Sequence, residues 1–175
     1  MHSTVTFKVA RALQNAGIAC LRFNFRGVQA SEGEHDGNGA EEGDVEAALD
    51  WLAGEHPGAP TWAAGFSFGS RTVFGLAKRE TRIERLVLVG FPVSAYSLEG
   101  VDTLSQPTLM VWGSEDEFGT DVDLRRQYPA LPSHLETARI EGADHFFMRF
   151  TKELEGTVHA WVRAALGLEQ HEAPR

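Results

Sequence analysis

Cysteine is almost absent from this chain of 175 residues, since Cys20 is the only one. One thiol can form neither an internal disulfide nor a CxxC metal site, so the sequence indicates a reducing, cytoplasmic compartment. The HExxH and Walker A patterns are also missing, and "GNGAEEG" (37–43) follows a loop, whereas a dinucleotide-binding fingerprint must follow a strand. We therefore expect neither a metal nor a cofactor.

Positive charge and long apolar runs are scarce as well. The chain has 16 Lys and Arg against 25 Asp and Glu, and a formal net charge of -9 repels phosphate backbones and anionic lipid. The longest strongly apolar stretch, 86–93, is far too short to cross a membrane, and the first twenty residues hold no apolar core of signal-peptide length. The sequence predicts a soluble protein without a nucleic-acid or membrane partner.

Apolar runs of strand length alternate with segments of helical periodicity. The length fits one domain over 1–167, followed by a frayed tail at 168–175. Strands are predicted at 18–25, 61–66, 85–91, 107–113 and 135–142, and helices at 3–16, 44–55, 69–80 and 146–167, with a glycine-rich loop at 27–43. This alternation is typical of the α/β class, with a mostly parallel sheet of about five strands flanked by helices.

One serine stands between two glycines in "GFSFG" (65–69). A sharp turn from strand to helix strains the residue at its tip, and side chains two positions away on either side would collide. Gly65 and Gly69 fit that requirement around Ser67. The G-x-S-x-G pattern alone is weak in a chain with 18 glycines, but its place between a strand and a helix favours a nucleophile elbow. Phe68 N–H would then point at the reaction centre as an oxyanion donor.

A nucleophilic serine needs a base to take its proton and an acid to orient that base. Of the seven histidines, only His145 follows a late strand and a glycine loop, so it is the candidate base. Three acids, Glu115, Asp116 and Glu117, directly follow the fourth predicted strand. Asp116 is the first choice because aspartate is the commoner third member, and the two glutamates stay open as alternatives. The order Ser, Asp, His is the order expected of the fold that uses this elbow.

Together these segments resemble the alpha/beta-hydrolase superfamily, and within it the small, lidless bacterial hydrolases related to dienelactone-hydrolase-like proteins. The segments that carry the resemblance are "LRFNFRGVQASEG" (21–33), "GFSFGS" (65–70), "VWGSEDEF" (111–118) and "GADHFF" (142–147). In that branch the first segment normally reads R-G-x-G-x-S, whereas Gln29 and Ala30 occupy the stretch of the second glycine here. The resemblance implies an alpha/beta-hydrolase fold and a Ser67–His145–Asp116 triad.

The resemblance also implies an abridged fold. The helix at 3–16 matches the one that follows the third strand of the family, so the strands before it are missing from this sequence. The loop that supplies the second oxyanion donor would lie at or just before Met1. Three explanations fit: the gene product starts upstream, the sheet is abridged, or another copy of the chain supplies the edge in a homo-oligomer. We favour the first explanation, because a buried strand with unpaired backbone groups is costly.

The leading functional hypothesis is a serine hydrolase that cleaves small carboxylic esters or thioesters through an acyl-enzyme on Ser67. Phe91, Phe118 and Phe146 are candidates for lining an apolar acyl pocket, although aromatic residues at such places are more often core. The alternative is a catalytically impaired scaffold or interaction domain with the same fold. The sequence does not identify the substrate.

Overall fold

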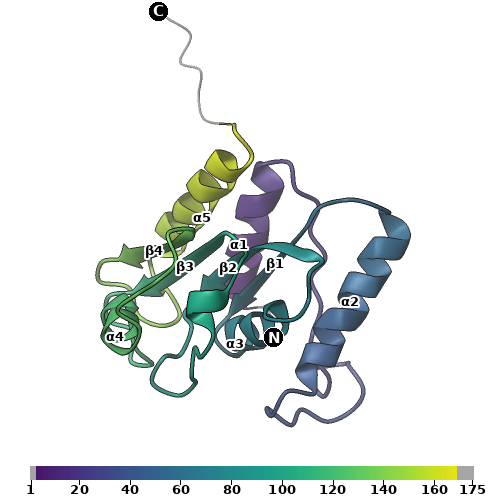
Figure 1. The fold of residues 1–175 in the computed structure, drawn as a ribbon, viewed down its shortest axis with the longest axis horizontal. Coiled ribbons are helices and arrows are strands. Elements are labelled where there is room, and N and C mark those ends of the chain that lie inside the picture. Colours follow the sequence, from purple (N-terminus) through teal and green to yellow (C-terminus); the bar gives the residue numbers. More distant parts are fainter. Residues whose placement is uncertain (1–2, 169–175) are drawn as a thin grey trace, which may run out of the picture.

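The computed structural model describes residues 3–168 and contains a central sheet of four parallel strands in the order β1-β2-β3-β4 (Figure 1). The strands are β1 (Thr61–Phe66), β2 (Ile83–Val89), β3 (Thr108–Gly113) and β4 (Leu135–Ile140). The helices are α1 (Thr4–Asn15), α2 (Glu41–Glu55), α3 (Phe68–Ala77), α4 (Asp121–Gln127) and α5 (Thr151–Ala165), and a short 3-10 helix covers Val101–Thr103. Residues 169–175, most of the predicted tail, lie outside the described part.

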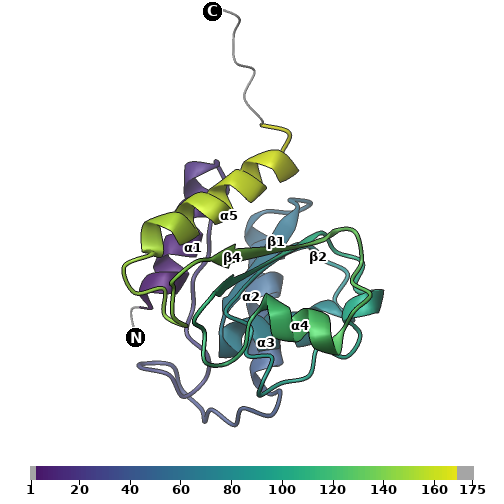
Figure 2. The same ribbon diagram turned by 90° about the vertical axis from the view of Figure 1, so that its left-hand side faces the viewer.

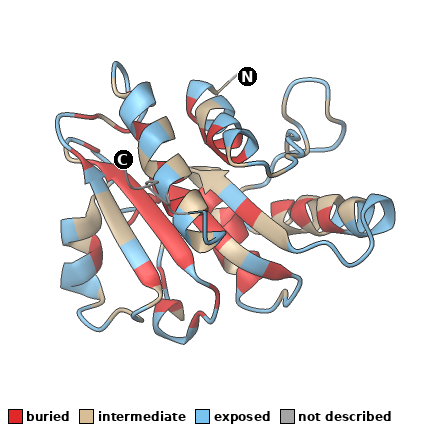
Figure 3. Cartoon of the chain, turned by 90° about the horizontal axis from the view of Figure 1, so that it is seen from above, coloured by how far each residue is buried: buried red, intermediate tan, exposed pale blue. Residues whose placement is uncertain are grey.

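Helices cover both faces of the sheet, with α1 and α5 on one face and α2, α3 and α4 on the other (Figure 2). Successive side chains of a strand point to opposite faces, so Leu86 and Leu88 of β2 pack toward α3 while Val87 and Val89 pack toward α1 and α5. Both faces are therefore apolar, and buried residues run along the two central strands, β2 and β3, whereas the edge strands β1 and β4 are only partly buried (Figure 3). Helices on both faces of the sheet explain the uninterrupted apolar run at 86–93 and confirm the predicted α/β class.

The segment at 18–25 is not the strand that its apolar residues suggested. It runs past α1 toward the glycine-rich loop without pairing to β1, whose one strand partner among the described residues is β2. Leu21 and Phe23 are 40% and 45% exposed. A strand exists only where a second backbone accepts its hydrogen bonds, so an apolar sequence of the right length is not sufficient. The sheet has four strands where about five were expected.

Two helices begin at other residues than predicted, and a third was not predicted. The helix α2 begins at Glu41, three residues earlier than expected, and α5 begins at Thr151 because Phe147 and Arg149 adopt positive φ angles that interrupt a helix. The helix α4 was not predicted, although Thr120 and Asp123 form a capping box at its start, with Thr120 N–H donating to the Asp123 carboxylate (2.9 Å). None of the described helices is both long enough and apolar enough to span a membrane.

Candidate active site

The candidate catalytic residues all follow the carboxyl ends of strands. Ser67 directly follows β1, Asp116 lies three residues beyond β3, and His145 lies five residues beyond β4. Parallel strands end at the same edge of a sheet, and ligands bind outside that edge in open α/β folds. The fold thus brings together residues that are 78 and 29 positions apart in the sequence.

The turn at Ser67 has the strain expected of an elbow. Ser67 adopts φ 53° and ψ -119°, a backbone conformation that residues other than glycine rarely adopt. Its N–H still donates to Val89 O of β2 (2.9 Å). A Cβ on Gly65 would collide with the Gly69 carbonyl and lie 2.5 Å from Ser70 N, so glycine is required at position 65. A Cβ on Gly69 would make only an ordinary contact with Phe25 at 3.8 Å. Only the first of the two expected collisions is therefore present.

Ser67, His145 and Asp116 form a continuous chain of hydrogen bonds. The distance from Ser67 Oγ to His145 Nε2 is 2.9 Å, and from His145 Nδ1 to Asp116 Oδ2 is also 2.9 Å. The second carboxylate oxygen, Asp116 Oδ1, accepts a hydrogen bond from Phe118 N–H (2.9 Å). His145 and Asp116 are 2% and 6% exposed, whereas Glu115 and Glu117 are exposed. With Asp116 accepting from Nδ1–H, the lone pair at Nε2 is free to accept the serine proton.

The loops that carry the acid and the base are built against each other. Ser114 Oγ accepts from Gly142 N–H (2.8 Å), and Glu115 N–H donates to Ala143 O (2.9 Å). The two loops approach so closely at Gly113 that a Cβ there would lie 2.6 Å from the Ala143 carbonyl carbon. This contact fixes the distance between Asp116 and His145 through backbone atoms.

Three aromatic rings surround the His145 imidazole. Ring centroids of Phe66, Phe118 and Phe146 lie 5.0, 4.7 and 5.2 Å from it, and the last two residues are 39% and 55% exposed. Sequence reasoning missed Phe66, although its place directly before the serine in the elbow was a signal. A Cβ on Gly90 would lie 3.2 Å from His145 Cε1, so this glycine makes room for the imidazole.

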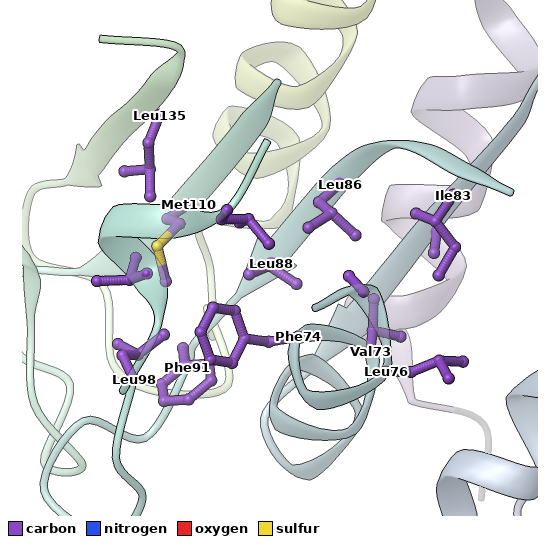
Figure 4. Packing of buried hydrophobic residues seen from close by; sticks show 14 of the residues in the cluster. Val73, Phe74, Leu76, Ile83, Leu86, Leu88, Phe91, Leu98, Met110 and Leu135 are labelled. Atoms are coloured by element: carbon purple, nitrogen blue, oxygen red, sulfur yellow. The ribbon is translucent and has the colours of Figure 1, made fainter. Parts of the chain in front are cut away.

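Phe91 lies elsewhere. It is fully buried, and its ring packs against that of Phe74 of α3, with 5.8 Å between the ring centroids (Figure 4). Its carbonyl accepts a hydrogen bond from Trp112 Nε1 (2.8 Å). The structure therefore places two of the three predicted pocket residues beside the imidazole and the third in the core between α3 and the sheet. The hydrophobic sequence around the end of β2 did not show that Phe91 belongs to the core, because a phenylalanine in the core and one in a pocket can have the same neighbours in the sequence.

The oxyanion position is only partly described. Phe68 is the first residue of α3, so its N–H has no acceptor one turn earlier within the helix and is free to bind an oxyanion. The position expected for the second donor, at or just before Met1, lies outside the described residues. In residues 3–168, no three His, Cys, Asp or Glu side chains are grouped so that they could hold a metal ion.

Comparisons with known proteins agree with this geometry. A family model described as alpha/beta hydrolase domain matches residues 1–171. The chain belongs to the alpha/beta hydrolase family. An uncharacterized protein of Rickettsia prowazekii (strain Madrid E), RP471, is 31% identical to this hydrolase domain in an alignment 171 residues long that covers 93% of this chain and 72% of that protein.

Two solved structures are also similar to this alpha/beta hydrolase. One is an alpha-beta serine hydrolase homologue from Coxiella burnetii, with a TM-score of 0.84, 31% identity, and coverage of 91% of this chain and 76% of that chain. The other is XC6422 from Xanthomonas campestris, described as an a/b serine hydrolase without lid, with a TM-score of 0.86, 30% identity, and coverage of 94% and 75%. The similarity to small, lidless hydrolases inferred from the sequence segments is thus confirmed.

The glycine-rich loop of this hydrolase is anchored to α2 by two carboxylates. Asp44 accepts from Arg26 through its backbone N–H (2.9 Å) and through Nη2 (2.8 Å), so Arg26 has a structural partner. The fully buried Glu41 accepts from Asp36 N–H (2.9 Å), and its Oε1 lies 2.7 Å from His35 Nδ1. The centroid of the His35 ring in turn lies 4.7 Å from that of the Phe68 ring, so the loop packs against the residue after Ser67.

The stability of this loop should depend on the ionisation of Glu41. Burial by itself would raise the pKa of Glu41, but hydrogen bonds from the backbone N–H groups of Gly37 and Asp36 outweigh it and lower the pKa to about 2. A carboxyl with a depressed pKa stabilises the folded state above its unfolded pKa, and this stabilisation is lost as the pH falls from about 4.5 toward 2. The Glu41→Gln variant should therefore lose less unfolding free energy between pH 5 and pH 3 than the natural protein.

Urea unfolding at pH 7, 5 and 3 measures this difference. Glu84→Gln removes an exposed carboxylate on β2 and should keep the pH dependence of the natural protein. Equal losses in the natural protein and in Glu41→Gln would show that Glu41 does not carry the acid sensitivity.

Proposed function

We propose that this protein is a serine hydrolase that cleaves small carboxylic esters or thioesters through an acyl-enzyme on Ser67. The observation that carries the proposal is the Ser67–His145–Asp116 chain, with both hydrogen bonds at 2.9 Å, at the carboxyl edge of the sheet. The Coxiella and Xanthomonas proteins are described as a serine hydrolase homologue and a serine hydrolase, at 31% and 30% identity, which supports the same chemistry here.

The acylation step uses the geometry as it stands. Ser67 Oγ attacks the substrate carbonyl carbon while His145 Nε2 accepts the hydroxyl proton, and Asp116 stabilises the resulting imidazolium. Phe68 N–H donates to the oxyanion of the tetrahedral intermediate. The bond to the leaving oxygen or sulfur then breaks, the leaving group takes the proton from His145, and the acyl group remains on Ser67.

Deacylation repeats these steps with water. His145 Nε2 accepts a proton from a water molecule as its oxygen attacks the acyl carbon, and the second tetrahedral intermediate collapses. The carboxylic acid leaves, and Ser67 Oγ recovers its proton from His145. Phe118 and Phe146 expose apolar surface beside the imidazole, which suits a short acyl or aryl group.

A fluorophosphonate probe tests the proposal directly, because it reacts with an activated serine hydroxyl and with little else. We expect labelling of the natural protein and of Ser133→Ala, which removes an exposed serine before β4, and none of Ser67→Ala. Circular dichroism of all three proteins controls for folding. A folded natural protein that takes no label would overturn the proposal and favour the scaffold alternative.

A further inference from the structure

Arg71 is a cation without a carboxylate partner, one helical turn after the nucleophile. Its backbone N–H donates to Ser67 O (3.2 Å), which places it in the first turn of α3. Further along the chain, Arg79 pairs with Glu42 and Glu46, and Arg82 pairs with Asp50 and Glu80. Among residues 3–168, Arg71 forms no ion pair, and its Nη1 is buried without a hydrogen-bond partner.

Two aromatic rings hold the Arg71 guanidinium. Its central carbon lies 5.9 Å from the ring centroid of Phe68 and 5.4 Å from that of Tyr96. Phe68 directly follows the nucleophile, and Tyr96 lies in the loop after β2, so both belong to the catalytic edge of the sheet. Stacking on rings leaves the N–H groups of a guanidinium free in its own plane, where they can donate to an anion.

The missing partner of such a group is an anion. Arg71 Nη1 itself is closed to solvent, so a ligand would bind the other guanidinium nitrogens, which are not among the buried atoms without a partner. A guanidinium matches a carboxylate with two parallel hydrogen bonds. The acidic surface would repel an anionic substrate, so recognition of one requires a local cation beside the nucleophile.

We propose that Arg71 binds a free carboxylate on the substrate, so that the preferred substrates are esters or thioesters that carry a second, ionised carboxyl group. This inference rests on the proposed function, because it assigns a substrate class to the same site. Arg71 acts on specificity and takes no part in the proton transfers between Ser67 and His145.

A second arginine provides a matched control. Arg85 also lies over an aromatic ring, with its guanidinium carbon 5.0 Å from the centroid of Trp62, and its Nε is also buried without a partner. It stands near the amino end of β2, however, opposite the edge that carries Ser67. Arg71→Gln and Arg85→Gln therefore remove the same charge from similar surroundings, and only the first is at the site.

The test compares substrates that differ only in charge. One pair is 4-acetoxybenzoate and the neutral 4-acetoxybenzamide, with the carboxylate on the leaving group. The other is monophenyl adipate and the neutral phenyl ester of adipamic acid, with the carboxylate or its amide replacement on the acyl group. For at least one pair, the natural protein should prefer the anionic member in kcat/KM. Arg71→Gln should reduce that ratio by roughly 10- to 100-fold, which is the range for a charge-assisted hydrogen bond.

Two further variants separate recognition from stability. Arg85→Gln should keep the ratio of the natural protein, and Arg71→Lys should keep part of the preference because it retains the charge. Ratios that do not change in Arg71→Gln, with or without a fall in its melting temperature, would overturn the inference and leave Arg71 a purely structural residue. A natural protein that hydrolyses both members of each pair equally would also overturn it, while leaving the proposed function intact.

A binding measurement keeps the two proposals distinguishable. Calorimetry with 4-acetoxybenzoate on the Ser67→Ala variant reports recognition without turnover. Binding that Arg71→Gln weakens by about tenfold or more in that background supports the anion site even if no ester is hydrolysed. Equal binding of the benzoate and the benzamide would contradict it.

Discussion

Replacing His145 by alanine should lower kcat/KM for an activated ester such as p-nitrophenyl acetate by about 100- to 10,000-fold, the range that a positioned general base contributes. Among the described residues, the imidazole is the group that contacts both Ser67 Oγ and Asp116, at 2.9 Å each, so its removal leaves the serine hydroxyl without a proton acceptor. Steady-state kinetics at pH 7.5 measures the loss. Added imidazole should restore part of the rate by entering the space that the substitution leaves.

The control for this prediction is another histidine. His56 is exposed after the end of α2, and His56→Ala should change the rate little. Asp116→Asn should also reduce turnover strongly with little change in packing, because an amide N–H facing Nδ1 favours the wrong imidazole tautomer. A folded His145→Ala variant with a loss of less than tenfold would contradict the assigned role.

Gly113→Ala should impair both stability and catalysis, although the glycine contacts no substrate. Its added Cβ would lie 2.6 Å from the Ala143 carbonyl carbon and 2.8 Å from Asp144 O, and these are backbone atoms that cannot rotate away. Overpacking of this kind costs about 1–3 kcal/mol of unfolding free energy. Relief of the clash must move the loop that carries His145, and a displacement of about 1 Å at a catalytic group costs about 100-fold in rate.

Urea unfolding and kinetics with the same ester measure both effects. Gly156→Ala is the matched control, because position 156 lies within α5 and a Cβ there meets nothing within 4 Å. That substitution should stabilise the protein by about 0.5–1 kcal/mol through helix propensity and leave the rate unchanged. A Gly113→Ala variant with natural stability and natural rate would show that the two loops are not held as closely as described.

The predictions that succeeded rest on local signals. The strand at 61–66 has the observed bounds, and the turn at Ser67 followed from a steric argument about Gly65 that the structure bears out. The missed helix α4 also had a local signal, the capping box of Thr120 and Asp123. The segment at 18–25 failed for a different reason: its residues suit a strand, but strand formation depends on a partner backbone elsewhere in the chain.

The candidate site also has a part that the sequence could predict and a part that it could not. From the order of elements, the sequence could identify a serine, a histidine and a group of three acids as residues at one edge of a parallel sheet. It could not decide among those acids, and only the structure shows that Asp116 reaches the imidazole while Glu115 and Glu117 point to solvent. Arg71 gave no sequence signal at all, since the absence of a partner is a property of its surroundings.

By itself, then, the sequence determined the alternation of strands and helices, the parallel sheet and the strained serine turn, because these depend on residues close together in the chain. The tertiary structure alone decided which strands have partners, which phenylalanines border the imidazole, and which charges stay unpaired. Each of these depends on contacts between segments far apart in the sequence, and such contacts cannot be predicted from periodicity and spacing.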